Sequence, residues 1–390
     1  MQFSSKAKGG LAALALLTVI GVCAWAYQLA FGLGVTGMSN ANSWGLYIAS
    51  FMLFVGLSAG GLIVASSASV FHIKQYKQVA VPAVITSTVC ILIAAMFILI
   101  DLGGIQRVWR LISGPNFSSP LLWDVCVITT YLVINILDLI WMCGKHADDR
   151  KVEALSRVAL PVAILVHSVT AWIFGLQIAR AWYTAIMAPI FVASALDSGL
   201  AILLIALVCL DAAGLFALSK DVFKSLAGLL ATCIAIDAFF IGCEVLTMAY
   251  PGAGEAVALS HMLTGATSPF FWAEIIGGLL VPFLILVFAK NRESTTLVLI
   301  ASALVICGVF CKRIWLLLTS FITPNVYGGP GISLGTSDAI AAHSPSTVWA
   351  TIGSYAPTAI EIAIWIGVIA LGGILFAVLS KKLLSPKAAK

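Results

Sequence analysis

The sequence predicts an all-α integral membrane protein with about ten transmembrane helices. Of its 390 residues, 61% are apolar and only 9% are charged, and the mean hydropathy is +1.09. Such values lie outside the range of soluble globular proteins, and each apolar run of about 20 residues is long enough to cross a bilayer. The net charge of +5 therefore describes the loops and gives no support for nucleic-acid binding.

Ten apolar segments follow one another along residues 1–390, which we treat as a single polytopic membrane domain. The first, Leu11–Phe31, has no obvious small-residue cleavage site, so we expect a retained span rather than a removed signal peptide. The other nine lie at 44–71, 80–102, 122–143, 157–180, 189–218, 222–249, 270–289, 295–318 and 357–380.

The basic residues predict the orientation of these spans. Sixteen of the 21 Lys and Arg fall on the side that holds both termini, and the other five are Arg107, Arg110, Arg180, Lys312 and Arg313, expected at the outer ends of helices. By the positive-inside rule, both termini are cytoplasmic in a bacterial inner membrane. The outer connections, above all the periplasmic loop 319–356, are longer and are predicted to form a docking surface.

A weak repeat divides the spans into two groups. Leu57–Leu62 (LSAGGL) resembles Leu196–Leu200 (LDSGL), Ser118–Asp124 (SSPLLWD) resembles Thr267–Glu274 (TSPFFWAE), and Arg180–Trp182 (RAW) resembles Arg313–Trp315 (RIW). The repeat predicts two parallel-related four-helix bundles, residues 44–180 and 189–318, with the first and tenth helices outside them.

Metal and haem sites are not indicated. The nine cysteines are scattered singly without a CxxC pair. We therefore expect neither c-type haem attachment nor a disulfide framework. Transmembrane b-haems need pairs of intramembrane histidines, and His167 is the only histidine inside an apolar segment. We therefore expect neither haem nor metal in this chain.

His167 is the leading candidate for chemistry. On a helix it shares a face with Thr170, Phe174 and Gln177. A quinone headgroup needs such a combination of a titratable group, a hydroxyl, an amide and an aromatic wall. Asp197 is the candidate to relay the second proton. The alternative is a histidine that bonds only to a neighbouring helix.

Carboxylates inside the spans extend this picture. Each ionisable group at a helix centre costs about 2.5–3.5 kcal/mol, so a cluster of them indicates a polar cavity or a proton route. Asp197 and Glu244 lie a few residues inside the outer ends and Asp237 is central, and these three form the predicted route. Ion pairs that hold helix ends together are the alternative.

The order of several motifs resembles the NrfD/PsrC family, the polysulfide reductase-like integral membrane subunits, in its longer ten-helix type. These motifs are Trp44-Gly45 with Phe54–Gly61, Asp101-Leu-Gly-Gly with Arg107–Arg110, His167 with Trp172–Gly175, and Ser268–Glu274, within about residues 40–320. One departure is that apolar Ile48 and Phe51 stand where shorter members contact the quinone with polar side chains.

The resemblance implies a haem-free anchor that binds quinone or quinol (menaquinone or ubiquinone) toward the outer side of the first bundle. It further implies a ferredoxin-like iron–sulfur subunit on the periplasmic side, with a molybdopterin, hydrogenase or multihaem cytochrome subunit beyond it. Such a chain is the quinone-reactive subunit of an oxidoreductase and is not catalytic alone. His167 and Asp197 match the family's histidine and aspartate, and Asp101, Arg107, Trp109, Arg110 and Arg180 are expected around the quinone at the outer mouth.

Three alternatives stay open. A secondary transporter also fits parallel repeats and buried carboxylates. A redox subunit that moves protons through Asp138, Asp211, Asp237 and Glu244 is a second, and a purely structural anchor is a third.

Overall fold

The computed structural model describes residues 5–143, 147–177, 180–251, 255–323 and 354–384. In these ranges, ten helices are long and apolar enough to cross a membrane. The predicted all-α class with ten spans is confirmed, and the chain is a multi-pass integral membrane protein.

The spans are single helices except for the eighth. They are α1 (Ser5–Phe31), α2 (Leu46–Val70), α4 (Ala80–Asp101), α6 (Pro120–Met142), α7 (Asp149–Gly175), α8 (Met187–Ala212), α9 (Lys220–Ala249), α13 (Thr295–Ile322) and α15 (Ala359–Leu383), with α11 (Ser268–Trp272), η4 (Ala273–Leu280) and α12 (Val281–Val287) forming the eighth. Short helices in the connections are η1 (Leu33–Val35), α3 (Lys74–Lys77), η2 (Ile105–Arg107), α5 (Arg110–Ser113), α10 (Glu255–Leu263) and η5 (Asn291–Glu293).

The fifth span is displaced from its predicted limits of 157–180. Helix α7 begins at Asp149 because the side chain of Asp148 accepts hydrogen bonds from the backbone N–H groups of Arg150 and Lys151, which caps a polar first turn. It ends at Gly175, where a Cβ would lie 2.9 Å from the Cβ of Met187. Arg180 therefore lies in the connection beyond the helix and not at its end.

The eighth span contains a π-helix, Ala273–Leu280, that the sequence pattern did not predict. The repeat explains its position, because Pro269 and Trp272 match Pro120 and Trp123, whereas the acidic residue follows one position later. A π-bulge accommodates one extra residue within a helix. The insertion thus shifts Glu274 around the helix axis relative to Asp124.

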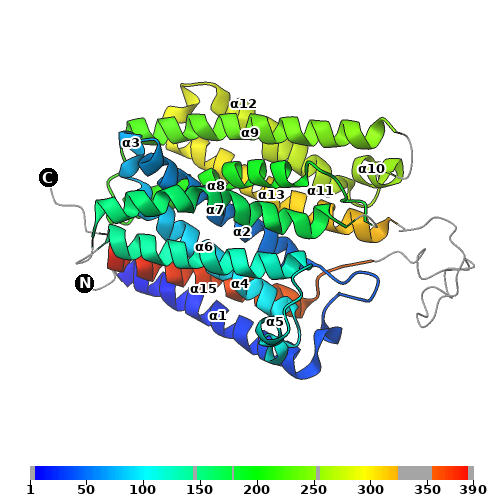
Figure 1. Ribbon diagram of the computed structural model, residues 1–390. Helices are drawn as coiled ribbons and strands as arrows, with labels where there is room; N and C mark the ends of the chain where they lie inside the picture. Colours follow the sequence, from blue (N-terminus) through cyan, green and yellow to red (C-terminus); the bar gives the residue numbers. More distant parts are fainter. Residues whose placement is uncertain (1–4, 144–146, 178–179, 252–254, 324–353, 385–390) are drawn as a thin grey trace, which may run out of the picture.

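Helix α2 lies at the centre of the molecule and packs against α4, α7, α8 and α13. The helices run side by side, and α1 begins and α15 ends at the same side of Figure 1. We call this the terminal end of the bundle and the opposite side the distal end. Helices α1 and α15 pair with each other at one edge, and α9 and α12 lie at the opposite edge.

The contacts between helices arrange the spans other than α1 and α15 in two groups of four, and within each group neighbouring helices pack in a ring. The first is α2, α4, α6 and α7, and the second is α8, α9, α12 with η4, and α13. The two-bundle division remains a proposal, and these contacts support it. Of the predicted loop 319–356, residues up to Ile322 belong to α13, and 324–353 lie outside the described residues.

The two groups meet where Gly60 of α2 faces Gly199 of α8. A Cβ at Gly60 would lie 2.5 Å from the Cα of Gly199, and a Cβ at Gly199 would lie 2.4 Å from the Cα of Gly60. Small residues let membrane helices approach this closely. The two glycines occupy matching positions of the sequence repeat, so the helices meet through corresponding residues.

Helix α15 is attached to α2 through Tyr355 and Glu361. The Tyr355 hydroxyl donates to Glu361 Oε1 at 2.7 Å and accepts from the backbone N–H of Leu46 at 2.8 Å. Burial, together with the nearby Glu361 carboxylate, raises the pKa of Tyr355, so its hydroxyl stays a donor across the physiological range.

The contact between α2 and α8 leads to a first prediction. Replacing Gly199 by Leu forces two backbones apart, and overpacking of this kind costs about 1–3 kcal/mol. We expect a lower midpoint of thermal unfolding in detergent for Gly199→Leu. Gly10→Leu is the control because a Cβ there meets nothing within 4 Å. Equal unfolding midpoints for both variants would contradict this packing.

Candidate functional site

The centre of the molecule holds a buried histidine–arginine pair. His167 of α7 and Arg313 of α13 are both fully buried, and Arg313 Nη2 lies 3.3 Å from His167 Nε2. A guanidinium only donates, so Nε2 is the acceptor and a neutral imidazole carries its proton on Nδ1. Among the described residues, the backbone of Phe191 is close to the imidazole, and the buried Nδ1–H has no side-chain acceptor.

Helix α8 completes this arrangement, which we call the His167 centre (His167, Arg313, Ser194 and Phe191). Arg313 Nη2 donates to Ser194 Oγ at 2.6 Å. The Arg313 guanidinium lies over the Phe191 ring, with Cζ 4.0 Å from the centroid. The Phe191 ring is also 5.3 Å from the His167 ring, so three helices from both groups converge here.

Aromatic rings cover the distal side of the His167 centre. Phe174 lies 6.1 Å from Phe191, and the rings of Trp44 and Trp182 lie 5.6 and 5.2 Å from Phe174. Phe321 packs on Trp182 at 5.6 Å. This layer separates the buried pair from the distal surface.

A charged cluster lies beside the His167 centre, made of Asp197, Asp237, Glu274 and Lys312. Lys312 Nζ lies 2.8 and 3.1 Å from the two Asp237 oxygens and 3.4 Å from Glu274 Oε1. All four side chains are buried. Removing several charges from water is costly unless they are paired, so these groups constrain one another's positions.

Asp197 differs from the other members of the cluster. Its side chain is fully buried, and neither carboxylate oxygen bonds another side chain among the described residues. It lies within electrostatic reach of Asp237, Lys312 and Glu274. When Arg313 is counted with this cluster, there are three carboxyls (Asp197, Asp237 and Glu274) and two cations (Lys312 and Arg313). Asp197 is the acid left without a cation.

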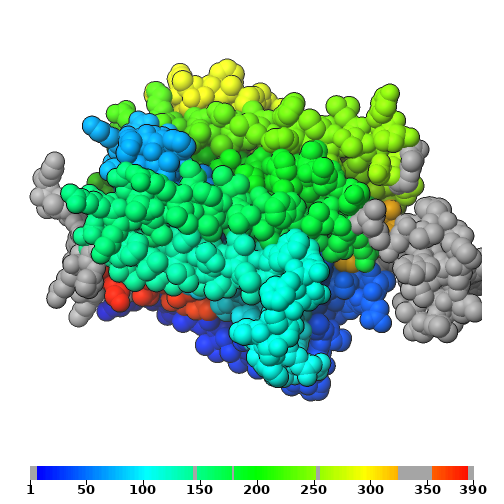
Figure 2. Space-filling view, in the orientation of Figure 1, coloured from blue at the N-terminus to red at the C-terminus, as the bar shows by residue number. Residues whose placement is uncertain are grey.

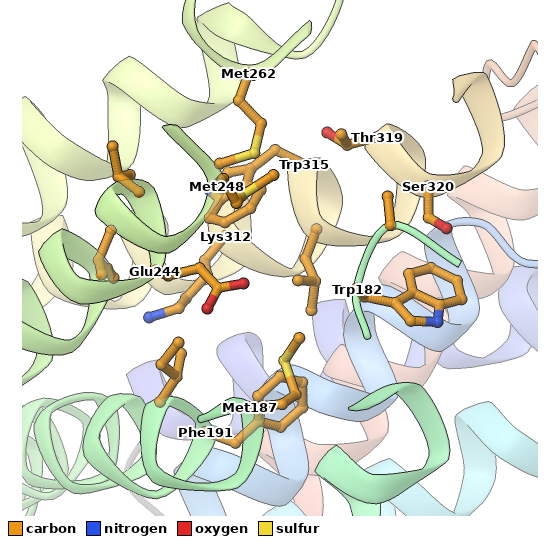
Figure 3. A pocket seen from close by; sticks show the side chains of 15 residues that line it. Trp182, Met187, Phe191, Glu244, Met248, Met262, Lys312, Trp315, Thr319 and Ser320 are labelled. Carbon is orange, nitrogen blue, oxygen red and sulfur yellow. The ribbon is translucent and has the colours of Figure 1, made fainter. Parts of the chain in front are cut away.

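A cavity opens between α8, α9 and α13 (Figure 3). Lys312 and Trp315 lie along it, and the Glu244 carboxylate points into it. Glu244 Oε2 accepts from Thr184 Oγ1 at 3.1 Å. The space open to the centres of water molecules is about 30 Å³, and one water needs about 10–15 Å³ by the same measure. In this conformation the cavity has room for about two or three water molecules.

The rest of the predicted stripe on α7 is not directed at a common ligand position. Thr170 Oγ1 donates to Asp124 Oδ1 at 2.7 Å, so it belongs to the contact with α6. Gln177 lies beyond the end of α7, and its amide donates to the backbone carbonyl of Ile173 at 2.8 Å. Phe174 lies in the aromatic layer. Of the stripe, only His167 and Phe174 line the central region.

The residues expected around the quinone at the outer mouth lie apart from the His167 centre, and their role stays a prediction. Asp101 belongs to a group with Tyr47 and Glu361 near α1 and α15. Arg107, Trp109 and Arg110 are exposed, and their segment projects from the distal edge in Figure 2. The Arg180 guanidinium lies 4.9 Å from the Phe321 ring centroid, on the aromatic layer.

Lys312 and Arg313 are a correction to the sequence prediction. They were expected at the outer end of their helix, but both are buried and α13 continues to Ile322. The apolar run after Arg313, IWLLLTSFI, was the signal that the span continues. Ser194, Phe191 and Trp44 were also missed, because small polar and aromatic residues are common throughout membrane helices.

Comparison with known proteins gives a family and several relatives. The profile of the family described as "Polysulphide reductase, NrfD" matches residues 34–325. A putative dimethyl sulfoxide reductase membrane subunit of Halobacterium salinarum is 36% identical over 96% of this chain and 90% of its own. An "Hdr-like menaquinol oxidoreductase integral membrane subunit" of Archaeoglobus fulgidus is 29% identical over 94% and 90%. A selenate reductase subunit of Mesobacillus selenatarsenatis is 24% identical over 85% and 86%.

The charged cluster generates the second prediction. Lys312→Met leaves Asp237 and Glu274 buried without their cation, and breaking a buried pair costs about 3–5 kcal/mol. We expect a large fall in folded yield and unfolding temperature, partly restored in the double variant Lys312→Met/Asp237→Asn. The control is Lys224→Met, which removes an exposed pair with Glu293 that solvent screens. If Lys312→Met is no less stable than Lys224→Met, the ion pairing described here is wrong.

Proposed function

The chain belongs to the polysulphide reductase, NrfD, family, and we propose that it is the haem-free quinone-binding subunit of a membrane-bound oxidoreductase. In this role it exchanges electrons between the membrane quinone pool and an iron–sulfur partner, and it is not catalytic alone. The names of the relatives support the proposal, since two of them name membrane subunits, of a putative dimethyl sulfoxide reductase and of a menaquinol oxidoreductase, and the third names a selenate reductase subunit.

The observation that carries the proposal is the Nδ1 atom of His167, which has no side-chain partner among the described residues and lies in a fully buried, aromatic-walled position. When oxidised, a quinol supplies two electrons and two protons. His167 Nδ1 is the group that bonds a ring oxygen, while Arg313 fixes the imidazole orientation through Nε2. Phe191 and Phe174 supply flat apolar surface for a ring. The residues present therefore fit a quinone.

Asp197 is the proposed proton-transfer group, because it belongs to the charged cluster beside the His167 centre and is not paired with a cation. Together with Arg313, the charged cluster has three carboxyls and two cations, so the group is neutral when one carboxyl holds a proton. Asp197 holds and releases that proton, and the water-sized cavity leads from the cluster toward Glu244. Asp237, held by Lys312, positions this step.

The proposed partner docks at the distal end, which we place on the periplasmic side of the cytoplasmic membrane. Of the basic residues that the structure describes, Lys312 and Arg313 lie in the interior, Arg107, Arg110 and Arg180 at the distal end, and thirteen at the terminal end. The exposed Arg107, Trp109 and Arg110 form part of the proposed docking surface for a ferredoxin-like iron–sulfur subunit. A molybdopterin, hydrogenase or multihaem cytochrome subunit lies beyond it in the proposed assembly.

A second candidate function is a redox subunit that also translocates protons. The observation that favours it is the charged cluster of Asp197, Asp237, Glu274 and Lys312, which electron exchange alone does not require. Intramembrane carboxylates of this kind are typical of proton relays.

The third prediction tests the quinone site. In the assembled complex, we expect His167→Ala to lower quinol-dependent turnover by about 10²–10⁴-fold, the usual contribution of a positioned acid or base. Activity measured at the partner subunits with an artificial electron donor should be unchanged, which shows that assembly is intact. His72→Asn, at an exposed histidine outside the site, is the control. Unchanged quinol turnover in His167→Ala would refute the proposal.

The fourth prediction separates the two candidates. The assembled complex is placed in liposomes, and proton movement and electron transfer are measured together during quinol turnover. If protons are translocated through the charged cluster, Asp197→Asn lowers the proton-to-electron ratio to the value of quinol oxidation alone. Asp221→Asn, at an exposed carboxylate, should leave the ratio unchanged. A wild-type ratio that already equals the value of quinol chemistry would exclude translocation.

A further inference from the structure

A groove runs along the side of the second helix group, between α9 and the π-containing span. The groove has an apolar wall and a volume of about 740 Å³. Leu246 and Leu280 on its rim are 69% and 50% exposed, so the groove opens on the outer surface of the helical bundle. Gly242 contributes an open stretch of wall, where a Cβ would meet nothing within 4 Å. Hydrocarbon chains are the natural contents of such a groove in a membrane.

The inner wall of this groove is also the wall of the cavity in Figure 3. Ile241 and Val245 line both spaces. Behind them lie Phe271 on the groove side and Trp315 on the cavity side, with ring centroids 5.6 Å apart. One layer of side chains therefore separates the lipid-facing groove from the interior.

The cavity offers polar groups that an acyl chain does not satisfy. Glu244 and Lys312 line it, and so do Trp182 and Ser320, whose Nε1 and Oγ are buried without a partner among the described residues. Unpaired polar atoms in a membrane interior are costly. A ligand that fits both spaces has a compact polar head and a long apolar tail.

We propose that quinol enters from the lipid through this groove, with its isoprenoid tail between α9 and α12, and that its ring passes through the cavity and past Phe191 to the His167 centre. This inference rests on the proposed function and names the entry path to its site. The ring of a quinol is neutral and can leave the interface, whereas a phospholipid headgroup is charged or zwitterionic and stays in it. The route runs through the second helix group, whereas the family resemblance places the quinone toward the first.

The cavity can enlarge to admit a ring. Its present opening is water-sized, and three of its lining side chains are methionines, Met187, Met248 and Met262. Methionine is unbranched and readily changes conformation. Ile241 and Val245 form the partition that must turn aside. Phe191 lies between the cavity and His167, at 5.3 Å from the imidazole, so a ring in the cavity is one side chain from the His167 centre.

The test fills the groove without touching the site. Gly242→Trp places an indole in open space, and Ala238→Trp does the same one turn earlier on the same helix face and serves if the first variant does not assemble. The control is Ile362→Trp, which fills a different groove, between α2, α13 and α15. The intact complex is reconstituted in liposomes, and labelling by a photoreactive quinone with an isoprenoid tail is measured alongside turnover.

We expect wild-type label on α9 or α12, and a decrease in labelling of about tenfold in Gly242→Trp or Ala238→Trp, equivalent to about 1.4 kcal/mol of binding. Turnover with the long-tailed quinol should fall with it, and Ile362→Trp should match wild type. The inference is overturned if the label is confined to α2, α4 or α6, or if labelling is unchanged in both groove variants. It is also overturned if the groove binds only phospholipid.

The two proposals fail separately. Loss of turnover in His167→Ala with unchanged groove variants would leave the quinone function standing and remove only the entry path. The opposite result is also possible: α9 is labelled in the wild type, Gly242→Trp abolishes this labelling, and His167→Ala keeps full turnover. That result would support the entry path and remove the proposed role of His167.

Discussion

The buried guanidinium of Arg313 is the interaction on which the interior depends. An arginine cannot shed its charge in a protein, so a fully buried one must be surrounded by acceptors, rings or opposite charge. It binds His167 of α7 and Ser194 of α8 and lies over Phe191. Successive residues on a helix point about 100° apart, so Lys312 reaches a different region, where it holds Asp237. Two consecutive cations thereby organise two adjacent parts of the interior.

The two helix groups meet through matching glycines but differ in what fills their interiors. In the first, Ser58, Ser87 and Tyr131 form a neutral network in which the Tyr131 hydroxyl lies 2.7 Å from Ser87 Oγ and donates to the Ser58 carbonyl at 2.9 Å. In the second, the position that matches Ser58 in the repeat is Asp197, which lies beside charged groups. A satisfied hydroxyl network stabilises packing without holding a mobile charge, whereas carboxyls and a lysine can exchange protons. The proposed proton route beyond His167 therefore runs through the second group.

A one-residue insertion connects the sequence repeat to this difference. The extra residue before Glu274 is absorbed by the π-helix, and Glu274 then reaches Lys312 and accepts from the indole N–H of Trp315. In the first group, Asp124 instead accepts from the Thr170 hydroxyl. The local change in helix register thus places Glu274 in an ionic cluster, whereas Asp124, its counterpart in the first group, bonds a hydroxyl. The same π-containing span forms one wall of the groove that we propose as the quinol entrance.

The sequence by itself determined the all-α membrane class, the ten spans and the prominence of His167. Hydrocarbon forces every backbone polar group to be satisfied within a helix, and a lone intramembrane histidine is visible in any apolar run. Only the tertiary structure decided what His167 touches, because its partner Arg313 is 146 residues away. Spans such as α2 and α8 are apolar around nearly their whole circumference, so the hydrophobic pattern does not say which face meets which neighbour. The rotation of α13 that buries Lys312 and Arg313, and the π-helix that turns Glu274 toward them, follow from helix packing across the whole chain.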